Sequence, residues 1–536
     1  MVGFQPAPEF FYLEWVSPRV RLLREVGVVA SNSRSFEAPI LVYKGAEAYV
    51  REEALVVVED ARFRRRYLGV LRLATKLDPL LTTSQRSAVI ERPEIAEEGV
   101  DIPYEVSVVR IIGEVSGSRV EPPTSPPTPR SKVYVVEYPA DLKLDLGSGL
   151  VVGVHKYSGV ELPLRPEALR YHVAVVGTTG TGKSRLVKAL VDEVLAKTGW
   201  SVVIFDHTGM DYVPYWPESV VRADEVVLDV ETITEGLKAA IGSVENLVEE
   251  YVPVALARYI ACEGGDEALC GKLGGAVGRS LQRSTPSPAS TSTAVPAPSR
   301  ERLEELTLRV SLGRGWDAVK LADYVNDTAR HLGARDSTRY KLSLYITLFA
   351  EHYVRRLNRM CRRVDELVEK ARRDRMVVVD LSTVETEARR VIVRRFLDRL
   401  WEIITERLEP VNTLVVIDEA HNYACYHGCS PSSSAVEKTL REGRKWNLGV
   451  VLASQRVVDF SPDVRNNVNT VFFSRLQTPY DFDQLRGFVD LAGIRSETLS
   501  LLETREFFFA GLGNPLKYPM LVRVRDVGEP PRVAGT

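Results

Sequence analysis

The sequence predicts an α/β fold: a domain with a mainly parallel sheet, preceded by a small N-terminal β-barrel and interrupted by a helical insertion. Short valine-rich segments fill about 20–115, and apolar runs alternate with amphipathic stretches from residue 133 onward. Short segments broken by turns are typical of barrels, whereas continuous apolar runs are typical of strands buried on both faces. With 536 residues, the chain is too long for one hydrophobic core and should form two or three domains.

The composition is that of a globular protein, 45% hydrophobic and 26% charged, with a net charge of -2. No global basic field attracts nucleic acid, so an anionic partner must be held by a local patch or an inner surface. The sequence has no run of 18 uncharged apolar residues, which predicts no membrane span. The segment MVGFQPAPEFFYLEW has acids and prolines where a signal peptide has a basic start and an apolar core, so we expect a cytoplasmic protein.

Residues 1–130 are predicted to form the β-barrel domain. Strand candidates are VGVVAS, APILVYK, AYVREEALVVVED, YLGVLRLA and VSVVRIIGEV. The segment EPPTSPPTPR at 121–130 is expected to be a linker or an extended strap, because proline lacks the N–H and fixes φ. No catalytic pattern stands out in this region, which indicates a docking or oligomerisation module.

A βαβ unit opens the α/β core, which is predicted for residues 131–234 and 374–536. The apolar run YHVAVVG is followed by the Gly-rich TTGTGKS, the amphipathic RLVKALVDEVLAK and a second apolar run, WSVVIFD. Further strands are predicted at 376–382, 413–420, 448–456 and 469–476. Residues 235–373 form the helical insertion, and the proline- and serine-rich 284–300 within it is expected to be a disordered loop.

The five cysteines are too few and too scattered for a disulfide framework. Cys425 and Cys429 flank a histidine in CYHGC, and His421 is nearby. Zinc could use such a cluster, but paired ligands elsewhere in the sequence are missing. The plainer interpretation is an exposed loop with ordinary thiols, and the question of a metal stays open.

The Gly-rich turn fits the phosphate-binding pattern G-x-x-x-x-G-K-[ST] in full. Glycines let backbone N–H groups point at phosphates, and a helix starting at Lys183 directs its positive end toward them. We expect Lys183 to reach the β- and γ-phosphates of ATP, and the Ser184 hydroxyl to bind Mg²⁺. The predicted nucleotide-binding residues are Gly177, Thr178, Thr179, Gly180, Thr181, Gly182, Lys183, Ser184 and Arg185.

Two acids follow a buried strand in LVVIDEAH. Asp418 and Glu419 should lie at the carboxyl end of that strand, where open α/β sheets bind ligands. Asp418 is predicted to hold Mg²⁺ through water and Glu419 to orient the attacking water, because phosphoryl transfer depends on positioning and charge stabilisation. A glutamate after the aspartate favours hydrolysis over kinase chemistry. The sequence therefore predicts a RecA-like P-loop ATPase domain.

Polar residues at other strand ends are further candidates. Gln455, in the triplet SQR, could sense the γ-phosphate, although a simple polar strand end is the alternative. Asp206, which ends VVIFD, is interpreted as structural. An arginine from a neighbouring subunit can contribute about 10³–10⁵ in rate, but each candidate also fits a surface or packing role. These candidates are Arg441, Arg444 and Arg475.

In this order, the motifs resemble the HerA–FtsK branch of P-loop motor ATPases, and most closely the archaeal HerA-type translocases. The resemblance rests on RYHVAVVGTTGTGKS, VIFDHTGMDY, TLVVIDEAHNYA, REGRKWNLGVVLASQR and NTVFFSRL, and it extends more weakly over about 20–525. Where the family has Asp-Pro-x-Gly-Glu-Tyr, this chain has DHTGMDY, with an extra residue and Asp for Glu. Asp211 is therefore given no family role.

The resemblance implies a homo-hexameric ring that binds ATP and Mg²⁺ between subunits and threads double-stranded DNA through its pore. It also implies a NurA-type nuclease as partner in DNA end resection and double-strand break repair, beside the Mre11–Rad50 machinery. The alternative is a related ATPase that moves a protein. A nucleotide-gated platform or a small-molecule kinase fits less well, because Glu419 is intact and no lid signature is present.

Contact with DNA must be local in a chain with almost no net charge. The segment ARHLGARDSTRYK holds five cations and one acid, and such residues can contact phosphates without reading sequence. The alternative is a solvated helix face. The candidates are Arg330, Arg335, Arg339, Lys341, Arg355, Arg356 and Arg359.

Overall fold

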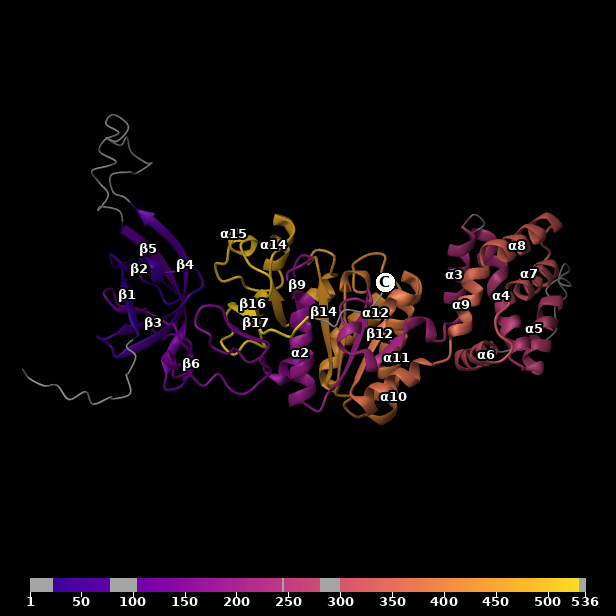
Figure 1. Ribbon diagram of the computed structural model, residues 1–536, viewed down its shortest axis with the longest axis horizontal. Helices are drawn as coiled ribbons and strands as arrows, with labels where there is room; N and C mark the ends of the chain where they lie inside the picture. Colours follow the sequence, from indigo (N-terminus) through magenta and orange to yellow (C-terminus); the bar gives the residue numbers. More distant parts are fainter. Residues whose placement is uncertain (1–22, 78–103, 243–244, 280–298, 530–536) are drawn as a thin grey trace, which may run out of the picture. The chain divides into compact units, whose positions relative to one another are not determined.

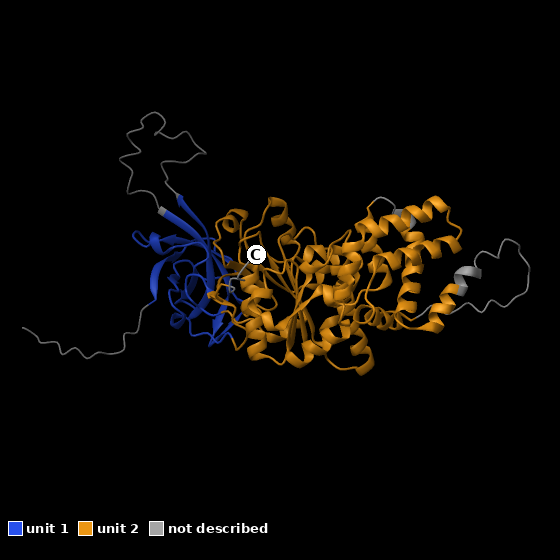
Figure 2. Cartoon of the chain, turned by 45° about the vertical axis from the view of Figure 1, so that its right-hand side comes forward, with its two compact units in different colours: residues 1–146, 155–161 blue, residues 147–154, 162–536 orange. Residues whose placement is uncertain are grey.

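The computed structural model describes residues 23–77, 104–242, 245–279 and 299–529. The chain divides into two compact units, residues 1–146 with 155–161 and residues 147–154 with 162–536 (Figure 2). Most of the loop predicted at 284–300 lies outside the described residues. Its last two residues are ordered, because Ser299 caps a helix that begins at Arg300, and the Ser299 Oγ accepts a hydrogen bond from the Arg302 N–H at 3.3 Å.

The first unit is a closed antiparallel barrel of six strands in the order β2-β1-β7-β3-β4-β5, with β2 pairing back onto β5. Alternate residues such as Val56, Val58, Tyr67 and Leu71 fill its interior. A short strand, β6, extends the sheet beside β5. The strands are β1 Arg24–Val29, β2 Glu37–Val42, β3 Leu55–Asp60, β4 Arg65–Leu77, β5 Tyr104–Ser116, β6 Arg119–Glu121 and β7 Lys132–Val135.

The proline-rich segment 121–130 is an extended strap on this barrel. Thr128 donates to Asp60 Oδ2 through both its N–H and its Oγ1, each at 2.9 Å. The Arg65 Nη1 donates to Thr124 Oγ1 at 2.5 Å and to Ser125 Oγ at 2.6 Å. Because proline cannot form a ladder, side chains of the β3–β4 hairpin hold the strap instead.

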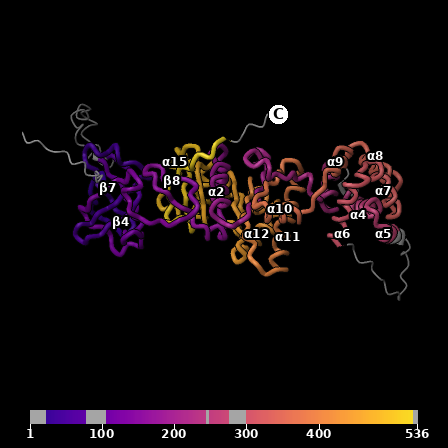
Figure 3. The backbone as a smooth tube through the Cα atoms, turned by 60° about the horizontal axis from the view of Figure 1, so that its bottom comes forward, coloured from indigo at the N-terminus to yellow at the C-terminus, as the bar shows by residue number. Residues whose placement is uncertain are grey.

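The second unit is built on a ten-stranded sheet, in the order β11-β12-β10-β13-β14-β9-β15-β16-β17-β8. From β11 to β15 neighbouring strands are parallel, and β15, β16 and β17 are antiparallel to one another. The C-terminal β17 packs against the helix that follows the Gly-rich turn (Figures 1 and 3). The strands are β8 Gly153–His155, β9 Val173–Val176, β10 Ser201–Asp206, β11 Val220–Arg222, β12 Met376–Asp380, β13 Thr413–Ile417, β14 Leu448–Ser454, β15 Thr470–Phe473, β16 Glu506–Gly511 and β17 Met520–Val524.

Helices cover this sheet and form the insertion between β11 and β12 (Figure 1). Side-chain caps begin several of them, as where Asp229 accepts from the Thr232 N–H at 2.9 Å and Asp317 from the Lys320 N–H at 2.8 Å. The last helix of the predicted insertion, α10, packs on β10 and β12 of the core. The helices are α2 Lys183–Lys197, α3 Val230–Ile241, α4 Glu245–Glu263, α5 Glu267–Arg279, α6 Arg300–Leu312, α7 Ala318–His331, α8 Asp336–Phe349, α9 Glu351–Arg356, α10 Val364–Asp374, α11 Thr386–Arg407, α12 Ser432–Glu442, α13 Pro462–Asn467, α14 Pro479–Arg486 and α15 Ser496–Ser500.

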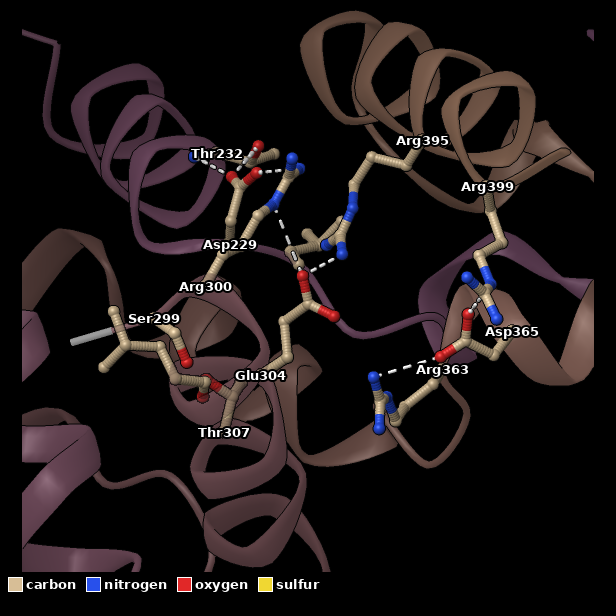
Figure 4. Close-up of polar contacts among 12 residues, drawn as sticks. Asp229, Thr232, Ser299, Arg300, Glu304, Thr307, Arg363, Asp365, Arg395 and Arg399 are labelled. Atoms are coloured by element: carbon tan, nitrogen blue, oxygen red, sulfur yellow. Dashed lines mark hydrogen bonds and ion pairs between the residues drawn. The ribbon is translucent and has the colours of Figure 1, made fainter. Parts of the chain in front are cut away.

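An arginine- and acid-rich cluster joins the insertion to the core (Figure 4). Arg395 of α11 forms an ion pair with Glu304 of α6, and both side chains are nearly buried. Arg300 pairs with Asp229 at 3.0 Å, next to the first turn of α3. The contacts link helices far apart in sequence and border two cavities of about 490 and 600 Å³.

The fold class predicted from the sequence is confirmed, but the prediction for the cysteines is wrong. Cys262 pairs with Cys270 and Cys425 with Cys429, at Cα–Cα distances of 4.9 and 5.6 Å. The tertiary fold brings each pair within disulfide reach, which sequence spacing alone does not show. The second disulfide uses both thiols of the considered metal cluster. Within the described residues, no helix is long and apolar enough to span a membrane.

Candidate nucleotide-binding site

The Gly-rich turn joins β9 to α2 and lies between the ends of two neighbouring strands. The Gly177 N–H donates to the carbonyl of Ser454, the last residue of β14, at 3.2 Å, and the Thr178 N–H donates to the carbonyl of Arg475 after β15 at 2.9 Å. Gly180 and Gly182 have φ values of +80° and +95°, where a side chain would strain the backbone. The strand–turn–helix context that a phosphate-binding loop requires is therefore present.

Lys183 is the first residue of α2, and its ammonium group folds back over the turn. Its Nζ donates to the carbonyls of Gly177 at 2.9 Å and of Thr178 at 3.4 Å. Burial lowers the pKa of Lys183, while the nearby carboxylates of Glu419 and Asp418 oppose that shift. The charged end of Lys183 thus lies between the turn and the acids that follow β13.

Three carboxylates converge beside the Ser184 hydroxyl. One oxygen each of Asp206, Asp211 and Asp418 lies within 4.8 Å of the others. Ser184 Oγ donates to Asp211 Oδ1 at 2.6 Å. Burial raises the pKa of Asp418 well above its usual value, and Asp211 and Asp206 raise it further.

The donor set fits a hard divalent cation. Such ions prefer oxygen ligands, and carboxylates and a hydroxyl are the groups gathered here. The buried Asp418 Oδ2 has no hydrogen-bond partner among the described residues, as expected of an oxygen that faces an ion or its water.

Asp206 holds the loop that brings Asp211 into this site. Its Oδ1 accepts the N–H groups of Thr208 at 3.2 Å and Gly209 at 2.9 Å, and its Oδ2 accepts those of Tyr212 at 2.8 Å and Val213 at 3.0 Å. These bonds agree with the structural interpretation of Asp206. Asp211, which was given no role because DHTGMDY departs from the family pattern, thus lies in the site; the signal for it was an acid in a Gly-containing loop after a buried strand.

A short hydrogen-bond chain links the Gly-rich turn to Glu419. Because β14 lies between β9 and β13, Gln455 at the end of β14 lies between both motifs. Gln455 Nε2 donates to Glu419 Oε1 at 2.6 Å, and Thr179 Oγ1 donates to Gln455 Oε1 at 3.1 Å. On the other side of Glu419, the His421 Nδ1 lies 3.2 Å from Oε2. The carboxylate is thus hydrogen-bonded by a side chain through Oε1, whereas Oε2 accepts no hydrogen bond within the described residues.

The candidate arginines lie in different surroundings. Arg475 is partly buried beside the turn, and its Nε has no partner among the described residues. Arg441 is exposed and lies 3.8 Å from Asp463, and the Arg444 guanidinium lies 4.2 Å from the centre of the Tyr171 ring. The three are thus not gathered at one point.

Two further residues contact the Gly-rich turn from the segment before β16. The Arg505 N–H donates to the Thr181 carbonyl at 2.8 Å, and Thr504 Oγ1 donates to the Gly180 carbonyl at 3.0 Å. The sequence analysis missed both, because only the tertiary fold brings residues 504–505 to the turn. The predicted Arg185 points elsewhere and lies 3.7 Å from Glu529.

The candidate DNA-contacting cations of the insertion are divided. Arg330 and Arg335 are exposed near the turn between α7 and α8. Others form ion pairs: Arg339 with Asp336, Arg355 with Glu351, Arg356 with Glu385 and Arg359 with Asp224. Lys341 is exposed and lies 5.5 Å from the centre of the Tyr345 ring. Only part of the set is therefore available without breaking an existing pair.

The fold and the turn–acid arrangement define a P-loop nucleotide-binding ATPase. Comparison with known proteins agrees: a family described as "Helicase HerA, central domain" matches residues 150–248. The chain is 23% identical to the DNA double-strand break repair helicase HerA of Pyrococcus furiosus, over 88% of this chain and 87% of that protein. The protein of the same name from Sulfurisphaera tokodaii is also 23% identical, over 93% and 92%.

Solved structures were compared as well. VirB4 of Thermoanaerobacter pseudethanolicus aligns with a TM-score of 0.43 and 16% identity, over 71% of this chain and 97% of that one. The family match and the HerA relatives, taken with the site, support a P-loop ATPase that is similar to HerA helicases.

Proposed function

We propose that this ATPase is a ring-shaped translocase or helicase that moves along double-stranded DNA. The observation that carries this proposal is the likeness to named DNA double-strand break repair helicases, which spans most of each chain and thus includes the barrel and the insertion. We further propose a homo-hexamer that works with a NurA-type nuclease, beside Mre11–Rad50, in end resection.

The residues of the site receive the following roles in this proposal. The backbone of the turn and Lys183 bind the phosphates of ATP, and Ser184, Asp418 and Asp211 hold Mg²⁺. The cation, when bound, neutralises negative charge on the phosphates. Glu419, positioned by Gln455, accepts a hydrogen bond from the attacking water and orients it. The link from Thr179 through Gln455 lets the turn influence where that carboxylate points.

An arginine from the neighbouring subunit completes the site in this proposal. Arg441 is the better candidate of the α12 region, because its ion pair with Asp463 is long at 3.8 Å, whereas Arg444, which is also exposed, lies against the Tyr171 ring. Arg475 is better placed to act within its own subunit, because its carbonyl already binds the Gly-rich turn. For DNA, Arg330 and Arg335 are the first candidates, since both are exposed.

The test is the rate of ATP hydrolysis with and without long linear duplex DNA. We expect strong stimulation by DNA in the wild type and loss of hydrolysis in Lys183→Ala and Glu419→Gln. Glu442→Gln is the matched control, because Glu442 is an exposed glutamate on α12. This variant should hydrolyse ATP at the wild-type rate. If DNA leaves the rate of ATP hydrolysis unchanged, with or without a nuclease partner, the proposed DNA translocase is rejected. An ATPase that moves a protein is then favoured.

A further inference from the structure

One end of the barrel carries a cluster of arginines and exposed phenylalanines that no part of the ATPase site uses. The ladder registers define this end: Asp60 of β3 pairs with Arg65 of β4, and Ser116 of β5 pairs with Arg119 of β6. Three turns therefore meet there, 30–36, 61–64 and 117–118, together with the end of the strap at 130–131. We call this set of turns the arginine end.

The arginine end presents cations that are not neutralised. Among the residues that the structure describes, Arg62, Arg64, Arg119 and Arg130 are exposed and form no ion pair with a carboxylate. Two acids of this end are paired, since Glu59 pairs with Arg66 at 3.0 Å and Glu114 with Arg65 at 3.5 Å, whereas Glu121 on β6 is exposed and the Asp145 N–H donates to the Ser118 carbonyl at 2.8 Å. In a chain of net charge -2, this is a local positive surface.

Two aromatic side chains stand out at the same end. Phe63, between Arg62 and Arg64, is 54% exposed, and Phe36 is 62% exposed. A single exposed apolar side chain is common on protein surfaces, but two at the same end, together with exposed arginines, mark a candidate binding surface. The Arg62 guanidinium lies 5.4 Å from the centre of the Phe63 ring. Exposed rings beside guanidinium groups can bind unpaired bases, because the rings stack on bases while the arginines contact the flanking phosphates.

The turn that carries Phe63 is held in one conformation. Asp60 Oδ1 accepts the N–H groups of Arg62 at 3.0 Å and Phe63 at 3.2 Å, and Asp60 Oδ2 accepts both donors of Thr128 at 2.9 Å. Backbone amides and the strap lower the pKa of Asp60 against the effect of its burial, so the carboxylate stays ionised. A fixed turn loses little conformational entropy when it binds, which favours binding.

We propose that the arginine end binds single-stranded nucleic acid. This deepens the proposed function and rests on it: the barrel would hold a strand with unpaired bases while the ATPase domain moves the duplex. An acidic protein segment could satisfy the arginines, but it would leave the two phenyl rings without a stacking partner. The combination of unpaired arginines and exposed rings therefore favours the strand.

The experiment measures binding of the full-length chain to a fluorescent oligothymidine strand at several salt concentrations. The plot of log K against log salt has a negative slope, to which each phosphate contact with a single strand contributes about −0.7. Arg62→Ala/Arg64→Ala should therefore reduce the magnitude of the slope by about 1.4. Phe63→Ala should weaken binding of the strand by about 5- to 150-fold, through lost stacking on one base. Its effect on a blunt duplex should be much smaller.

The controls come from the same unit. Arg24→Ala/Arg51→Ala removes two exposed arginines from the opposite end of the barrel and should leave the slope unchanged. Arg119→Ala/Arg130→Ala is a second variant of the arginine end and should lower the slope independently. Thermal unfolding of every variant checks that the barrel is intact.

Two outcomes overturn this inference. An unchanged slope in both arginine-end variants rejects it, and so does loss of polyglutamate binding in Arg62→Ala/Arg64→Ala with strand binding intact, which would indicate an acidic protein partner. Stimulation of ATP hydrolysis by duplex DNA is measured on the same preparations. If the wild type shows that stimulation and the slopes are unchanged, the arginine end fails alone and the proposed function stands.

Discussion

Replacing Gln455 by leucine tests whether the chain from Thr179 to Glu419 positions the catalytic carboxylate. The substitution keeps the volume similar but removes the 2.6 Å hydrogen bond to Glu419 and the 3.1 Å hydrogen bond from Thr179. A hydrogen bond to a charged group contributes about 1.5–3 kcal/mol. If Glu419 needs that bond in the transition state, kcat for ATP should fall about 10- to 150-fold.

The assay is steady-state release of phosphate, together with direct binding of a fluorescent ATP analogue. We expect ATP affinity to change by less than about threefold, because the phosphates are bound by the turn and Lys183 rather than by Gln455. Gln477→Leu, an exposed glutamine in the segment after β15, is the matched control. A kcat within twofold of the wild type, or a loss that lies entirely in ATP affinity, would refute the positioning role.

Three further predictions concern buried ionisable side chains. Burial and neighbouring acids raise the pKa of Asp418, so a cation competes with a proton for this carboxylate and the affinity for Mg²⁺ should rise with pH. Calorimetry in buffers of different ionisation enthalpy should detect proton release on Mg²⁺ binding, and Asp418→Asn should reduce it. Glu304→Ala leaves a buried arginine without its partner and should cost about 3–5 kcal/mol of unfolding free energy in urea. Glu305→Ala, which removes a solvent-screened carboxylate of α6, should change the unfolding free energy far less. Burial lowers the pKa of His155 and of His172 from 6.5 to about 4, so between these pH values the unfolded state binds more protons than the native state. The free energy of unfolding should therefore fall by up to about 3 kcal/mol per histidine as pH drops from 6.5 to 4. In a glutamine variant at either position, the free energy of unfolding should depend less steeply on pH.

Local sequence was sufficient for the motifs whose chemistry is contiguous. The Gly-rich turn with its lysine and serine lies within eight residues, and the backbone conformation that it needs is encoded by glycines at fixed positions. The same holds for Asp418 and Glu419, because four apolar residues predict the strand whose end places them. The barrel, the parallel sheet and the helical insertion were likewise visible in the period of the apolar residues.

Contacts between distant segments could not be predicted in this way. Asp211 reaches Ser184 only because Asp206 folds the intervening loop with four backbone hydrogen bonds, and Arg505 reaches the turn from more than 300 positions away in the chain. The disulfides join residues only 8 and 4 positions apart, but they were not predicted either, because pairing depends on the local backbone geometry and not on spacing alone. Periodicity and spacing report what one segment does locally, whereas these contacts depend on how separate segments pack, which only the tertiary structure decides.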